Sequence, residues 1–259
     1  MRRLVAAALA FVAALAFAAG TAPAREVRVF AAGPRFDMGW AASREAFRAK
    51  LLALVDARRR GAGPAAMQVT ARDVASRLRG PADPRDPVRT ARDLVALPED
   101  LGLMAAFAGA RGAPARSAPD LTTSIAGLLA SYAPVVAAYT ARFPELAARP
   151  SPPTRALALA LTDTFGRVAV ETFAELADRL DAYVVAGVSM AQDWRVVCAD
   201  RAAMPPLPGG ARCEREDAAR VALLRAPDEP SRTYAYEATS PRPSTMGLVF
   251  DPDGRLISK

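Results

Sequence analysis

Strand-like and helix-like segments alternate along this chain of 259 residues, and that order constrains its fold more than any other feature. The clearest strand is Ala182 to Met190 (AYVVAGVSM), which directly follows an amphipathic helical stripe over residues 173–180. Upstream, residues 26–31 (EVRVFA) and 93–97 (DLVAL) also have the composition of strands. An order of strand, helix, strand, helices and strand predicts an α/β fold.

Helices are predicted in the segments between these strands. Ser43 has the character of an N-cap, and apolar residues at helical spacing follow from Phe47 to Val55. A second apolar stripe runs over residues 121–132, and Pro134 should end or kink that helix. Residues 104–119 are rich in alanine and glycine, which predicts a loop with a short helical piece.

The last part of the chain predicts short strands and turns. Residues 221–224, 233–237 and 246–250 favour strands. Residues 251–254 (DPDG) predict a turn, and residues 255–257 the start of a returning hairpin strand.

The first residues have the pattern of a secretory leader. Arg2 and Arg3 precede an apolar run from Leu4 to Ala19, and the small residues of Ala22-Pro23-Ala24 offer a peptidase site. Because a membrane span needs about 20 apolar residues, we expect residues 1–24 to be a cleaved signal peptide. The mature protein is then secreted or periplasmic, with no stable membrane span. A membrane anchor formed by an uncleaved leader is the alternative.

Export bears on the two cysteines, Cys198 and Cys213, which lie 15 residues apart in a stretch rich in proline and glycine. Exported compartments permit disulfides. A bridge closing a loop of this length stabilises a protein by about 3 kcal/mol in the chain-entropy model. We therefore predict a Cys198–Cys213 disulfide, with two unpaired thiols as the alternative.

Composition excludes several functions. The chain has no histidine, so it cannot supply a Ser-His-Asp or Cys-His catalytic system or a histidine-based zinc site. Its net charge is +7, but the only dense basic run, residues 58–60, has no aromatic residues among it, so no nucleic-acid partner is expected. The sequence also lacks a dinucleotide fingerprint, a phosphate loop and a complete calcium loop. We expect no metal and no organic cofactor.

Three short motifs follow one another in a suggestive order. Residues 94–99 (LVALPE) are a strand that ends in Pro-Glu, and residues 173–177 (FAELA) and 183–187 (YVVAG) are a helix and the next strand. Residues 244–256 (STMGLVFDPDGRL) are a strand and a hairpin turn. In this order the motifs resemble the nitrilase superfamily of carbon–nitrogen hydrolases, in which the first strand delivers a glutamate and the last corresponds to an Asn-Thr-Ala strand.

The resemblance covers roughly Val27 to Lys259, with insertions near residues 61–90 and 191–217. It implies that residues 25–259 form a carbon–nitrogen hydrolase domain and part of an α-β-β-α sandwich. Pro243-Ser244 departs from the pattern, because the family usually has Tyr-Asn before the Thr-Ala pair.

The resemblance also implies a chemistry. In the family a cysteine thiolate attacks an amide, nitrile or carbamoyl carbon, a glutamate is the general base and a lysine stabilises the developing charge. Glu99 matches the glutamate. Lys259 stands closer to Gly254 than the family's lysine does to its glycine, and both cysteines precede the lysine region instead of following it.

The resemblance thus implies a domain truncated at its carboxyl end, with Glu99 as the one catalytic residue in the chain and no turnover by the 259 residues alone. The expected partner is a small amide, nitrile or carbamoyl substrate, and homo-oligomerisation is left open. The alternative is an exported non-enzymatic binding protein or a degenerate, inactive relative.

Overall fold

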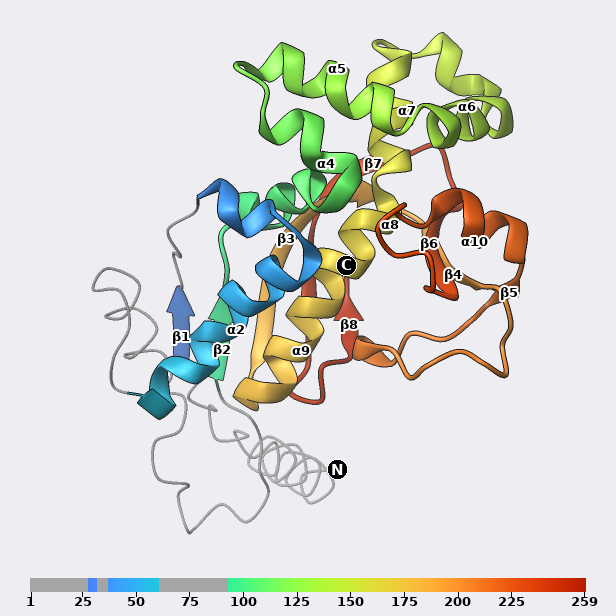
Figure 1. The fold of residues 1–259 in the computed structure, drawn as a ribbon. Coiled ribbons are helices and arrows are strands. Elements are labelled where there is room, and N and C mark those ends of the chain that lie inside the picture. Colours follow the sequence, from blue (N-terminus) through green and yellow to red (C-terminus); the bar gives the residue numbers. More distant parts are fainter. Residues whose placement is uncertain (1–27, 32–36, 61–92) are drawn as a thin grey trace, which may run out of the picture.

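The computed structural model describes residues 28–31, 37–60 and 93–259 (Figure 1). It is 52% helical and 19% strand, which confirms the mixed α/β class in its general form. The leader expected at residues 1–24 and the insertion expected at 61–90 lie outside the described residues.

The larger sheet has five strands in the order β1-β2-β3-β7-β8. The first three are parallel, whereas β7 and β8 are antiparallel to their neighbours. The strands predicted at 93–97, 182–190 and 246–250 are confirmed, as is the described part of the first strand. The bounds are β1 (Arg28–Ala31), β2 (Asp93–Ala96), β3 (Tyr183–Ala191), β7 (Pro243–Phe250) and β8 (Leu256–Ser258).

Helices η1 and α2 precede β2, and a long, mostly continuous helical series from η2 to α9 connects β2 to β3. The predicted N-cap is confirmed, because Ser43 Oγ accepts a hydrogen bond from Ala46 N at 3.1 Å. The predicted kink is confirmed as well, because Pro134 lies in the first turn of α6 and the axes of α5 and α6 differ by 75°. The bounds are η1 (Met38–Ala41), α2 (Arg44–Arg60), η2 (Glu99–Phe107), α4 (Gly109–Arg116), α5 (Leu121–Ser131), α6 (Ala133–Arg142), η3 (Pro144–Ala148), α7 (Pro152–Ala160), α8 (Thr162–Phe165), the π-helical turn η4 (Gly166–Val170) and α9 (Glu171–Leu180).

Helices α2 and α9 lie side by side across one face of the larger sheet (Figure 1). Val95, Val184 and Phe250 occupy paired register positions on three neighbouring strands, and all three are fully buried. The ring of Phe173 on α9 contacts Phe250 on the sheet and Phe47 on α2, with centroids 6.4 Å apart in both pairs. These edge-to-face contacts join the two helices and the sheet in one core.

A smaller sheet of three strands follows β3 in the chain, in the order β5-β4-β6. Its buried side chains include Val196, Tyr234 and Tyr236. The strand predicted at 233–237 is confirmed as β6, but β4 lies in the segment whose prolines and glycines predicted only an irregular insertion at 191–217. The bounds are β4 (Trp194–Cys198), β5 (Arg215–Glu216) and β6 (Tyr234–Ala238), with η5 (Pro208–Gly210) between β4 and β5.

Two local predictions are wrong. Residues 221–224 belong to helix α10 (Ala218–Leu224), whose first turn is capped by Asp217 accepting a hydrogen bond from Arg220 N at 2.9 Å. Residues 104–119 are mostly helical, in η2 and α4, where a loop with only a short helical piece was expected. Their small side chains allow close packing, since a Cβ on Gly112 would lie 2.0 Å from the Phe107 carbonyl oxygen.

No single helix among the described residues is long and apolar enough to span a membrane. Helices α5 and α6 have the required length and apolar content only as a pair, and the pair is bent by 75°.

Candidate functional site

Glu99 is the first residue of η2, just past the carboxyl end of β2. It is exposed and forms no hydrogen bond or ion pair with the described residues. The backbone at Glu99 packs directly against Gly187 of β3. A Cβ on Gly187 would lie only 2.7 Å from the Glu99 carbonyl oxygen and 2.8 Å from the Glu99 Cα. A glycine is therefore needed for the close backbone approach that positions Glu99.

Lys259 and the two cysteines, whose positions do not match the family's lysine and nucleophile, are engaged elsewhere. Lys259 Nζ donates a hydrogen bond to the Gln192 carbonyl oxygen at 3.2 Å and lies 5.3 Å from the centre of the Trp194 ring. Cys198 and Cys213 are joined in a disulfide, as their spacing predicted, with Cα atoms 5.6 Å apart. Glu99 thus has neither a thiol nor an amine as a partner in the described structure.

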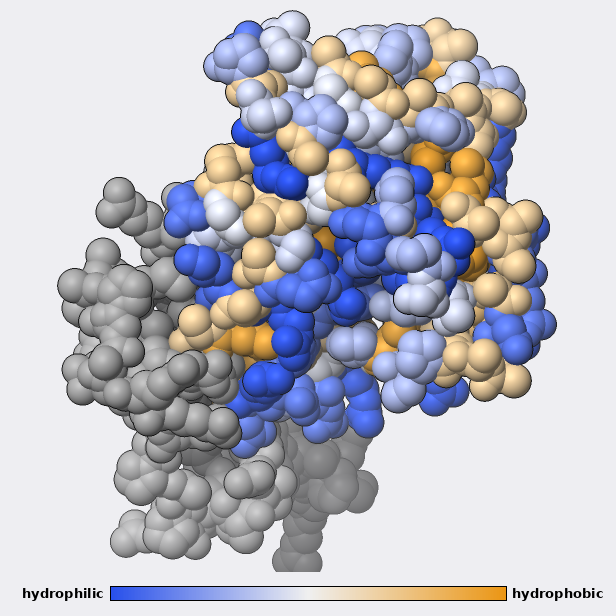
Figure 2. All heavy atoms as spheres, viewed as in Figure 1, coloured by the Kyte–Doolittle hydropathy of each residue, from blue (hydrophilic) through white to orange (hydrophobic). Residues whose placement is uncertain are grey.

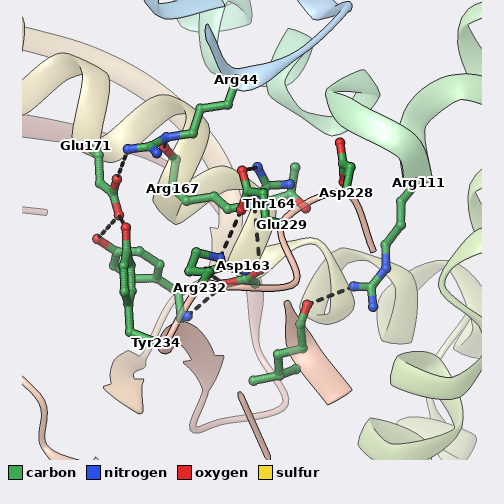
Figure 3. Close-up of polar contacts among 12 residues, drawn as sticks. Arg44, Arg111, Asp163, Thr164, Arg167, Glu171, Asp228, Glu229, Arg232 and Tyr234 are labelled. Atoms are coloured by element: carbon green, nitrogen blue, oxygen red, sulfur yellow. Dashed lines mark hydrogen bonds and ion pairs between the residues drawn. The ribbon is translucent and has the colours of Figure 1, made fainter. Parts of the chain in front are cut away.

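A buried ionic cluster, which the sequence did not predict, lies on the helix that runs from α8 through η4 into α9. Asp163, Arg167 and Glu171 stand four residues apart, and each is at most 2% exposed. Arg232, from the loop before β6, donates two hydrogen bonds to the Asp163 carboxylate, at 2.9 and 2.6 Å. Arg167 Nη1 donates to Glu229 Oε1 at 2.8 Å. Figure 3 shows these side chains converging from separate parts of the chain.

Glu171 has three donors around its carboxylate. Arg44 Nη2, at the first residue of α2, lies 2.5 Å from Oε2. The hydroxyls of Tyr234 and Tyr236 donate to Oε1 at 2.8 and 3.1 Å. Burial still raises the pKa of Glu171, because desolvation outweighs these donors. Burial and the nearby Glu171 charge raise the pKa of both tyrosines, so each remains a hydrogen-bond donor.

The guanidinium groups of Arg44 and Arg232 are stabilised in their charged form. Burial alone would lower the pKa of Arg44, but the Glu171 carboxylate reverses the effect and raises it. Burial would also lower the pKa of Arg232, and the Asp163 carboxylate raises it instead. Both arginines therefore stand in salt bridges that are largely shielded from water, and removing one partner of such a pair is costly.

A cavity of about 470 Å³ opens beside these pairs. It lies where the first turns of α2 and α9 face the 205–208 segment and the loop of residues 228–232. On the visible face of the molecule, hydrophilic residues gather in the region between α2 and α10 (Figure 2). The side chains that line the cavity and belong to the ionic cluster are Arg44, Glu171, Glu229, Arg232 and Tyr234.

The described residues contain no group of three or more histidine, cysteine, aspartate or glutamate side chains suited to hold a metal ion. The carboxylates of the cluster instead face arginines and tyrosines.

One signal in the sequence could have revealed the cluster. Asp163, Arg167 and Glu171 recur every four residues in a segment that is otherwise mostly apolar. Charges at that spacing share one side of a helix, and an apolar setting indicates that this side is buried. Their partners could not be inferred, since Arg44 and Arg232 lie 127 and 69 residues away from Glu171 and Asp163.

No protein-family model, curated protein or solved structure gave a significant match to this chain.

Proposed function

We propose that this chain carries the general base of a carbon–nitrogen hydrolase of the nitrilase type, which acts on a small amide, nitrile or carbamoyl compound. The main support is the placement of the three sequence motifs. The motif strands β2, β3 and β7 are consecutive neighbours in one sheet, and the hairpin strand β8 follows. Motifs separated by tens of residues in the sequence thus lie side by side.

The position of Glu99 supports a catalytic role. Sites in open α/β sheets gather beyond the carboxyl ends of the strands, and Glu99 lies just past the end of β2. A general base must be free to accept a proton from a group within hydrogen-bond reach. Glu99 meets that condition, because its carboxylate has no partner among the described residues.

The less covered face of the larger sheet, which the start of η2 reaches at Gly187, fits the proposed sandwich architecture. Val185 and Val249 are half-buried, and Thr245 and Gly247 are exposed, on the face opposite the buried row of Val184. Small and apolar side chains of this kind allow two sheets to pack face to face. The second sheet of an α-β-β-α sandwich would lie against this face.

The proposal requires a nucleophile and a lysine that this structure does not bring to Glu99. It therefore predicts their codons downstream of Lys259 in the same reading frame, with the cysteine after the lysine. DNA sequence beyond that codon tests this requirement directly. An in-frame stop with no such residues would favour the alternative of a non-catalytic binding protein.

The activity test uses the protein extended through that lysine and cysteine. Ammonia release is measured with a panel of aliphatic amides, nitriles and carbamoyl compounds. Glu99→Gln preserves the shape of the side chain but removes the base, which should lower kcat by about 10²–10⁴. Glu145→Gln, at an exposed glutamate on η3, is the matched control and should leave the rate unchanged.

Two results would reject this function. One is an active extended protein whose rate is indifferent to Glu99→Gln. The other is amide or nitrile hydrolysis by the 259-residue chain that is lost on replacing Cys198 or Cys213.

A further inference from the structure

We propose that the cavity beside the Arg44–Glu171 pair binds a small organic cation, with an ammonium or guanidinium group on a short hydrocarbon chain. Glu99 does not line this cavity, so the site is separate from the proposed catalytic one. The inference goes beyond the hydrolase proposal and does not depend on it.

The first argument is the charge of the cavity wall. In a chain with a net charge of +7, the lining carries an excess of two negative charges. Carboxylates concentrated at a cavity favour a ligand of opposite sign. The charged lining residues are the guanidiniums Arg44 and Arg232 and the carboxylates Glu45, Glu171, Asp228 and Glu229.

The second argument is that both lining cations are already paired, whereas two of the four lining carboxylates have no ion pair with the described residues. Arg44 is bound to Glu171, and Arg232 is bound to Asp163 through both terminal nitrogens. These arginines are therefore poor receptors for an anion. In contrast, Glu45 and Asp228 form no ion pair with the described residues.

Glu229 offers the best-placed acceptor. Its Oε1 accepts from Arg167, but its Oε2 is buried and receives no hydrogen bond. Arg232 Nε lies 2.9 Å from that oxygen, in an orientation that makes an ion pair without a hydrogen bond. A buried acceptor without a donor is costly. The Glu229 side chain as a whole is 20% exposed and lines the cavity, so a small rotation would turn this oxygen toward a ligand ammonium or guanidinium N–H and form a charge-assisted hydrogen bond.

The third argument is the remaining wall. Pro205, Pro206, Leu207 and Pro208 line one side of the cavity, and Pro230 lies in the opposite loop. Proline has no backbone N–H to donate, so these residues present mainly hydrocarbon. The cavity volume of about 470 Å³ falls within the range of small-molecule sites. A cationic head beside Glu229 and a short alkyl chain along the prolines match both parts of the wall.

Isothermal titration of the 259-residue chain with matched probes tests the proposal. Butylguanidine is a cation, and butylurea is its neutral isostere; inorganic phosphate is the anionic probe. We expect saturable one-to-one binding of butylguanidine, binding of butylurea at least tenfold weaker, and no binding of phosphate. Glu229→Gln should weaken butylguanidine binding by about 10- to 100-fold, because it removes the negative charge that strengthens a hydrogen bond to the cation.

A second variant guards against misfolding, since loss of the Glu229 charge also affects Arg167. Glu45 is exposed on α2 and lines the cavity. Glu45→Gln should keep the fold and weaken binding by about two- to fivefold, an effect that added salt reduces. Glu145→Gln, away from the cavity, is the matched control for a lost surface charge.

The proposal is overturned if butylguanidine does not bind, if butylurea binds as tightly, or if phosphate binds instead. It is also overturned if Glu229→Gln and Glu45→Gln both leave the affinity unchanged while circular dichroism shows folded protein. None of these measurements involves catalysis, so failure here is distinguishable from failure of the hydrolase proposal.

Discussion

Gly187 and Gly247 allow a matched test of how the sheet positions Glu99. The two glycines are directly paired on neighbouring strands β3 and β7. A Cβ on Gly187 would lie 2.7 Å from the Glu99 carbonyl oxygen, whereas a Cβ on Gly247 would have no atom within 4 Å. The same substitution to alanine therefore meets backbone at one position and open space at the other.

We expect only the Gly187 variant to lose stability. Gly187→Ala forces the Glu99 backbone to move, and overpacking of this kind costs about 1–3 kcal/mol. Gly247→Ala should be neutral or stabilise by roughly 0.5–1 kcal/mol, because glycine loses more chain entropy in a strand. Each kcal/mol corresponds to a shift of roughly 2–4 °C in Tm for a chain of this size.

Thermal unfolding followed by circular dichroism measures both variants under the same conditions. Equal Tm values for Gly187→Ala and Gly247→Ala would refute the argument that the Glu99 backbone rests on Gly187. In the extended protein, Gly187→Ala should also lower kcat while Gly247→Ala does not.

Two further predictions concern the buried charges. Asp163→Asn should lower the free energy of unfolding, measured in urea, by about 3–5 kcal/mol, because Arg232 and Arg167 lose their buried carboxylate. The control Asp253→Asn, at an exposed position, should lower it by no more than about 1 kcal/mol. A similarly small loss for Asp163→Asn would contradict the conclusion that Asp163 forms a buried salt bridge. Glu171 and Glu175, on the same helix, should show opposite pH dependence. Burial raises the pKa of Glu171 in the folded state, so the stability of the wild type relative to Glu171→Gln is greatest below the unfolded-state pKa and is lost as pH rises through the folded-state pKa. At Glu175 burial is outweighed by Arg48, which lowers the pKa, so the stability relative to Glu175→Gln is present above the unfolded-state pKa and is lost as pH falls through the folded-state pKa. Urea unfolding from about pH 3 to pH 8 measures both differences, and slopes of the same sign would disprove the reasoning.

Local pattern was sufficient for the elements that build the larger sheet. The apolar, valine-rich run of β3 and the helical spacing of apolar residues in α9 indicate the type of each element without knowledge of its partners. The position of Glu99 after β2 followed in the same way. The short apolar run at residues 221–224 fits a strand or a helix equally, and the Asp217 cap decided for the helix.

Features that depend on distant partners could not be predicted. Strand β4 is stabilised by pairing with β6, some 40 residues later, in a segment whose prolines and glycines indicate a loop. The ionic cluster needs Arg44 at the start of α2 to contact Glu171 on α9, and Arg232 near β6 to contact Asp163 on α8. No local rule identifies these partners, because long-range contacts are set by the packing of the whole fold.

The π-helical turn η4 places a constraint on the gene as well as on the protein. It lies between Asp163 and Glu171, and a regular α-helix turns by about 100° for each residue. A π-helical turn already holds one residue more than an α-helical turn, so the loss of one residue restores a regular helix, whereas one added residue would rotate all of α9 by about that angle and separate Glu171 from Arg44 and the two tyrosines. Every residue from Asp163 to Glu171 is buried, so this segment has no outer surface on which substitutions can accumulate. Among descendants of this sequence, codon-sized insertions should therefore be tolerated in the loops and be absent between Asp163 and Glu171.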